Sequence, residues 1–157
     1  MRRPFAAILA LALALTLAGP ATAGGNPPIA FPAGVACTFE LHIYVGTGGP
    51  VHRQDLANGV VLSAGRGNAL VFENASTLAT LATPATGAVT RTVPGADGGS
   101  TVTMMGANVL IMWPTDSPPG PSTTLYIGRV VITMDAQANT TLISAAGKSL
   151  DVCAALS

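Results

Sequence analysis

Three side chains that could support acid–base chemistry occupy alternate positions near residue 40. Glu40, His42 and Tyr44 lie in the segment "VACTFELHIYV", residues 35–45, in which apolar and polar residues alternate. Strand side chains alternate between two faces, so these three would share one face, with neighbours about 7 Å apart. A carboxylate, an imidazole that titrates near neutral pH and a phenol could bind a ligand or assist a hydrolysis. The interpretation we favour is a solvated outer strand face, which carries the same residue types.

A second candidate ligand site begins in the proline-rich segment "MWPTDSPPGPSTTLYIGR". Residues 114–122 form a long connection in which four prolines favour extended geometry. Long loops are a common location for binding residues, so Trp113 and Asp116 are candidates. In the alternative that we favour, Trp113 packs under the prolines and closes one end of the domain.

The strand that follows this loop supplies Tyr126 and Arg129. Its sequence "LYIGRVVITM" is apolar on both faces, which is typical of a central strand, a cavity wall or a contact between two copies of the chain. An arginine buried there without a partner would be costly. We expect an ion pair between Arg129 and Asp116 or Asp151, and the alternative is a site for an anionic ligand.

Local catalytic motifs are missing from the sequence. His52 and Asp55 could pair within one turn, but zinc would need a further ligand, and capping of the turn by Asp55 is the interpretation that we favour. No segment matches G-x-S-x-G, a P-loop, H-E-x-x-H or a calcium loop. The sequence therefore predicts no catalytic residue, no metal site and no cofactor.

The elements that would position these residues are short strands. Segments of high β-propensity alternate with turn sequences such as "GRGN" and "PGADGG". This pattern predicts a single antiparallel β-sandwich or small β-barrel of about eight to nine strands. The polar segment 52–59 reads as a turn, and residues 148–156 as a short helix or strand. The expected strands are 35–45, 60–64, 69–75, 76–83, 88–93, 100–106, 108–113, 123–135 and 140–147.

The only two cysteines, Cys37 and Cys153, stand near the two ends of the predicted domain. In an exported chain the simplest interpretation is one disulfide between the terminal strands. A catalytic thiol would need a nearby base, and neither cysteine has a histidine in its local segment.

The start of the chain resembles an export signal. Residues 1–23 combine "MRR", an Ala/Leu run and the small residues of "ATA", which predicts a signal peptide cleaved after Ala23 by the general or the twin-arginine route. We expect residues 24–34 to form a Gly/Pro-rich arm without regular structure, and residues 35–157 to form one all-β domain. After residue 23 no apolar run is long enough for a transmembrane helix.

The charge of the predicted mature chain excludes one class of partner. It holds five basic and seven acidic residues, a net charge of 5 − 7 = −2, so there are too few cations for a nucleic-acid interface. Only 9% of residues are charged, against about 25% in typical domains. A surface of Thr, Ser, Asn and Gly suits an exported protein.

Two segments carry a resemblance. The sequences "WPTDSPPGPSTTLYIGRVV" and "AAGKSLDVCAAL" resemble a group of small secreted actinobacterial proteins that have no assigned activity. The resemblance implies export, a β architecture and a pair of terminal cysteines, and it implies no reaction.

These observations lead to a functional expectation. We expect a secreted, non-enzymatic β domain that binds a partner or serves as a structural component outside the cell or in its envelope. The main alternative is a small β-barrel that carries an apolar ligand in its interior. A less favoured one is a hydrolase assembled by the fold around His42 or His52.

Overall fold

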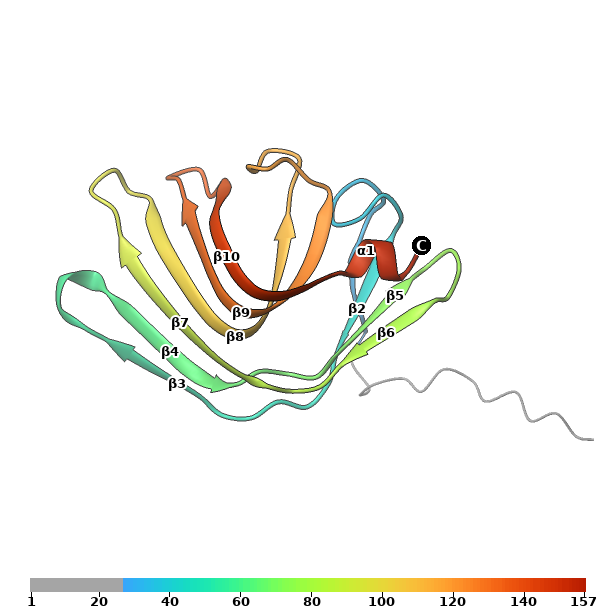
Figure 1. Ribbon diagram of the computed structural model, residues 1–157, viewed down its shortest axis with the longest axis horizontal. Helices are drawn as coiled ribbons and strands as arrows, with labels where there is room; N and C mark the ends of the chain where they lie inside the picture. Colours follow the sequence, from blue (N-terminus) through green and yellow to red (C-terminus); the bar gives the residue numbers. More distant parts are fainter. Residues whose placement is uncertain (1–26) are drawn as a thin grey trace, which may run out of the picture.

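The computed structural model describes residues 27–157, which form two antiparallel sheets (Figure 1). The strand orders are β1-β2-β5-β6 and β10-β9-β8-β7-β4-β3. The all-β prediction is confirmed, with ten strands and no closed barrel. The predicted signal peptide lies outside the described residues. The strands are β1 Ile29–Phe31, β2 Leu41–Val45, β3 Val51–Asp55, β4 Val61–Arg66, β5 Leu70–Asn74, β6 Thr80–Thr83, β7 Gly87–Pro94, β8 Ser100–Met112, β9 Ser122–Met134 and β10 Thr140–Asp151.

The strand boundaries differ from the expected ones in several places. The strand expected over 76–83 begins only at Thr80, and the one expected over 140–147 continues to Asp151. Segment 52–59 is not only a turn, because it contributes most of β3, an edge strand whose five residues are all exposed. The segments 100–106 and 108–113 form one strand, β8. The expected arm includes β1, and the strand expected over 35–45 begins only at Leu41. An edge strand exposed on both faces lacks the apolar alternation that marks a strand in sequence.

Three runs of chain pass from one sheet to the other. The pairs β2–β3, β4–β5 and β6–β7 are separated only by residues 46–50, 67–69 and 84–86. Each run therefore contributes one strand to each sheet, and the three connections lie where the sheets meet. Strands β8, β9 and β10 stay in the six-stranded sheet over 12 or 13 residues each.

A row of glycines bends these long strands. The register places Gly106 opposite Gly128, and Gly128 opposite Gly147. All three have positive φ, at 94°, 148° and 114°, a region that L side chains rarely adopt. A Cβ at Gly106 would lie 2.2 Å from the carbonyl oxygen of Gly87. Figure 1 shows the resulting deep curve of β8, β9 and β10.

The curved sheet separates two hydrophobic clusters. Even-numbered residues of β8, such as Val102 and Leu110, belong to a cluster on its concave face together with Val130 of β9. Odd-numbered residues, such as Val109 and Ile111, pack against a second cluster centred on Leu41 and other residues of the four-stranded sheet. The alternation of side chains continues through Gly106. Even-numbered residues of β8 therefore lie on the concave face, and odd-numbered residues on the other face, on both sides of the bend.

The predicted disulfide between Cys37 and Cys153 is confirmed, with a Cα–Cα distance of 5.5 Å. Cys37 lies before β2 and is fully buried, while Cys153 lies in the short helix α1, Val152–Ala155. The bond therefore joins the two ends of the described chain beside the core, although neither cysteine is in a strand. Within residues 27–157, no helix is long and apolar enough to cross a membrane.

Candidate functional site

The carboxylate of Asp116 organises the proline-rich loop. Asp116 is only 6% exposed. Its Oδ2 accepts the backbone N–H of Trp113 at 2.6 Å, and its Oδ1 accepts that of Thr140 at 2.7 Å. The loop is also tied to β10, because Ser117 donates its N–H to Thr140 and accepts that of Leu142. Asp116 therefore satisfies backbone groups and does not point toward a ligand.

The expected ion pair between Arg129 and a carboxylate was wrong. Arg129 is exposed, and the salt bridges found in residues 27–157 do not include it. The two-sided apolar pattern of its strand arises because β9 passes from one environment to another. Its even-numbered residues line the concave core, whereas the odd-numbered ones change from buried at Thr123 to exposed at Ile127 and Arg129 and are buried again at Val131.

The two aromatic candidates, Trp113 and Tyr126, are packed against other side chains of the fold. Trp113 is partly buried, and its ring lies 5.8 Å from the ring of Phe31 in β1. Tyr126 packs against the concave cluster. Both rings therefore contribute to packing, and Trp113 contacts the strand that the sequence pattern did not reveal.

Glu40, His42 and Tyr44 do share a site, and Glu73 completes it. His42 Nε2 lies 2.9 Å from Glu40 Oε1, and His42 Nδ1 lies 3.4 Å from Glu73 Oε1. The register of β2 and β5 places His42 opposite Glu73. The Tyr44 hydroxyl donates to Glu73 at 3.1 Å. The structure thus adds Glu73, which sequence alone could not pair with His42 because the two are far apart in the chain.

The polar side chains of this cluster pair with one another on the outer face of the four-stranded sheet. Desolvation and the Glu73 carboxylate raise the pKa of Tyr44 above its ordinary value, so the phenol stays a neutral donor to Glu73. The His42 side chain is 22% exposed and that of Glu40 is 51% exposed. None of these residues lines the pocket between the two sheets. A protonated His42 would bridge two carboxylates, which is an electrostatic contact within the sheet.

Neither the pairing of His52 with Asp55 nor the capping of the turn by Asp55, which we favoured, is found in residues 27–157. Both residues lie in β3 at an odd separation, so their side chains project from opposite faces. Asp55 instead accepts a hydrogen bond from Arg53 at 3.0 Å. Among residues 27–157, no group of three His, Cys, Asp or Glu side chains could hold a metal ion.

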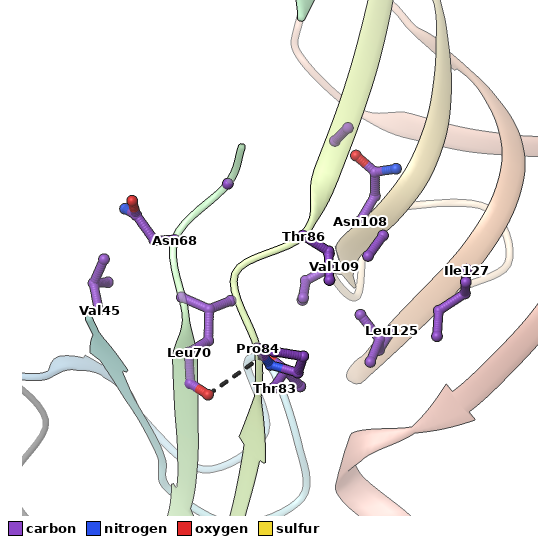
Figure 2. A pocket seen from close by; sticks show the side chains of 13 residues that line it. Val45, Asn68, Leu70, Thr83, Pro84, Thr86, Asn108, Val109, Leu125 and Ile127 are labelled. Carbon is purple, nitrogen blue, oxygen red and sulfur yellow. Dashed lines mark hydrogen bonds between the residues drawn. The ribbon is translucent and has the colours of Figure 1, made fainter. Parts of the chain in front are cut away.

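An apolar pocket of about 390 Å³ lies where the two sheets meet. Its walls come from the connections that carry the chain between the sheets and from the facing part of β8 and β9. Figure 2 shows Val45, Leu70 and Pro84 on one side and Val109, Leu125 and Ile127 on the other. The remaining lining residues are all small or polar and uncharged: Gly67, Asn68, Thr83, Thr86, Ala88, Ala107 and Asn108.

The pocket is continuous with the core. Leu70, Val109 and Leu125 pack against the cluster between the sheets, while Ile127 at the other extreme is 53% exposed. The sheets therefore diverge from a packed floor toward solvent, and the space between them is an open apolar cleft.

One polar group beside the pocket has no partner. The side-chain nitrogen of Asn108 is buried and makes no hydrogen bond with any group in residues 27–157. Because Asn108 alternates with Val109 along β8, its side chain projects toward the opposite, concave face. Figure 2 agrees, since its amide is directed away from Leu125 and Pro84. The amide is a cost to stability and does not contribute a polar contact to the pocket.

The sequence did not indicate this pocket. Its lining residues are ordinary strand and turn residues from six strands and two connections. Only the pairing of strands brings them together. The alternative that we considered placed a void inside a closed barrel, whereas the structure has an open cleft between two sheets.

Comparisons of the chain with models of known families, with curated proteins and with solved structures found no match.

Proposed function

We propose that this chain is an exported binding protein that acts without catalysis and takes a small apolar ligand into the pocket between its sheets. The observation that carries the proposal is the pocket itself, which is about 390 Å³ in volume and has no charged residue in its lining. Pockets of about 300 to 1,000 Å³ with mainly apolar walls are typical of small-molecule sites.

The form of the pocket supports an extended or flat apolar ligand. Its floor is fixed by core side chains, such as Leu70 and Leu125, so it needs no rearrangement to admit a ligand. Hydroxyl and amide groups at Thr86 and Asn68 could contact a polar end of that ligand. A neutral molecule with a short alkyl chain fits this chemistry best.

Two features support export. The disulfide closes a sequence separation of 116 residues, and such bonds persist in oxidising compartments. The first 23 residues carry the sequence pattern of a signal peptide. The place of action would then be outside the cell or in its envelope.

Filling the pocket tests this function. Ala107→Leu adds bulk to a lining residue, and Ala146→Leu makes the same change at an exposed position of β10. We expect 1-decanol, titrated by calorimetry, to bind the wild-type protein and Ala146→Leu equally. We expect Ala107→Leu to weaken binding by at least about tenfold. Equal binding by both variants, or none by the wild-type protein, would reject the pocket as the site.

A further inference from the structure

Four of the five cationic residues in the six-stranded sheet lie on one face. Strand alternation and register place Arg66, Arg91, Arg129 and Lys148 on the side opposite the concave cluster. We call these four residues the cationic face. All four are exposed. They include four of the five basic residues between positions 27 and 157.

The register fixes their spacing. Arg91 is paired with Thr103, and Arg129 with Met105, so these two arginines lie diagonally on either side of β8. Lys148 is opposite Ile127, two residues from Arg129 on the same face. From strand geometry the Cα atoms of Arg91 and Arg129 are about 12 Å apart, and those of Arg129 and Lys148 about 8 Å. Arg66 lies at the margin, at the end of β4.

No strand carboxylate neutralises this face. The two acidic residues in the strands of this sheet are Asp55 and Asp151, which are aligned with Val61 and Thr124. Both therefore project toward the opposite, concave face, where Asp55 also pairs with Arg53. Asp97 and Asp135 lie in turns and bind backbone N–H groups there. The positive charge is thus concentrated although residues 27–157 have a net charge of 5 − 7 = −2.

Exposed apolar side chains lie among the cations. Met105 is 48% exposed and Ile127 is 53% exposed. Met105 is the direct neighbour of Arg129 across β8 and β9, and Ile127 is the neighbour of Lys148. A purely ionic partner such as an acidic polysaccharide gains nothing from such side chains. The interface of a lipid bilayer offers both anionic headgroups and an apolar layer beneath them.

We propose that the cationic face docks on a membrane surface that contains anionic lipids. The arginines and Lys148 contact lipid phosphates, while Met105 and Ile127 reach the boundary between headgroups and acyl chains. Each cation near such a surface strengthens binding about fivefold. Ile127 also lines the ligand pocket, so the docked face lies beside the pocket. The test below replaces none of the residues that line the pocket, so the two proposals can fail separately.

The test uses sedimentation of the full chain with vesicles, and every variant shares residues 1–26, so any contribution of that segment cancels. The vesicles contain equal parts of phosphatidylglycerol and phosphatidylcholine, or phosphatidylcholine alone. We expect each of Arg91→Gln, Arg129→Gln and Lys148→Gln to weaken binding to the anionic vesicles about fivefold, and the triple variant about 100-fold. Arg53→Gln is the matched control, because it removes the same charge from the opposite face.

Several results would overturn the proposal. If Arg53→Gln weakened binding as much as Arg129→Gln, the net charge of the protein and not the cationic face would determine binding. Equal binding of the wild-type protein to neutral and anionic vesicles, or no binding to either, would also contradict the proposal. Met105→Gln should weaken binding to the anionic vesicles, because it removes an apolar contact with the bilayer. If Met105→Gln bound the vesicles as tightly as the wild-type protein does, and the wild-type protein bound alginate tightly, the partner of this face would be an acidic polysaccharide and not a membrane. Unfolding temperatures of all variants should match the wild-type protein, because the altered residues are exposed.

Discussion

At the level of single residues, Asp116 has a structural role that its sequence context did not predict. The sequence suggested a charge partner for Arg129 or a ligand contact in a proline-rich loop. In the fold, the carboxylate accepts the N–H groups of Trp113 and Thr140 and so joins the loop to β10. The sequence shows that a carboxylate and an arginine occur in neighbouring segments. It does not show which backbone N–H groups the fold leaves in need of an acceptor.

This role predicts the cost of removing the carboxylate. Asp116→Ala leaves two N–H groups with no acceptor in a buried site, so we expect the free energy of unfolding to fall by about 2 to 4 kcal/mol. Chemical denaturation measures this change. Arg129→Ala is the control and should change the free energy of unfolding by less than about 0.5 kcal/mol. An equal loss in both variants would mean that the two residues form an ion pair in solution.

Asn108 provides a second prediction for a single side chain. Its buried amide nitrogen has no partner, and burial of such a group costs about 1 to 3 kcal/mol. Asn108→Val should therefore raise the free energy of unfolding by about 1 kcal/mol.

Asn74 is the matched control, because its amide is satisfied: it donates to Leu156 at 3.0 Å and accepts from Ser76 at 2.9 Å. Asn74→Val should lower the free energy of unfolding by about 2 kcal/mol or more. A loss of stability in Asn108→Val would show that this amide has a partner in solution, such as a bound water.

At the level of elements, the sequence predicted strands well where one face is apolar and the other polar. It placed β4, β5, β7, β9 and β10 within a few residues, because their alternation or apolar runs report burial. It missed β3, which is exposed on both faces. It also divided β8 at Gly106, because a glycine inside a strand pattern looks like a turn until its pairing partner is known.

The row of glycines that bends the long strands can be recognised only from the register in which the strands pair. Gly106, Gly128 and Gly147 are far apart in sequence, and only the register aligns them. A Cβ at Gly128 would lie 2.1 Å from the carbonyl oxygen of Ala146. Gly128→Ala should therefore lower the free energy of unfolding by at least about 3 kcal/mol.

Gly87→Ala is the matched control for the glycine row. It lies in the neighbouring strand β7, and a Cβ there would meet no atom closer than 4.0 Å. We expect its unfolding temperature to stay within a few degrees of the wild-type value. A normal unfolding temperature for Gly128→Ala would contradict the close approach of β9 and β10 at the bend.

At the level of the whole molecule, the disulfide joins both ends of the described chain to one core. Its loop of 116 residues should stabilise the fold by about 4 to 5 kcal/mol in the chain-entropy treatment. Reduction, or the double variant Cys37→Ser and Cys153→Ser, should shift denaturant unfolding to a lower concentration by this free energy. An unchanged midpoint after reduction would mean that the core holds the ends together without the bond.

The candidate site was much less predictable than the fold class. Sequence alternation correctly placed Glu40, His42 and Tyr44 on one face, but it could not supply Glu73, which only the pairing of β2 and β5 brings to His42. The apolar pocket gave no local signal, because it is formed by the divergence of two sheets. Export and the resemblance to secreted actinobacterial proteins stay predictions.

Native mass spectrometry of the protein recovered from the culture medium of its own host tests the central claim most directly. We predict a chain that lacks its first 23 residues, that has lost the two hydrogens of the cysteine pair, and that retains a small apolar molecule. The retained molecule should be absent when Ala107→Leu is recovered in the same way. A wild-type protein that is free of any ligand, or a ligand retained equally by Ala107→Leu, would contradict the proposed function.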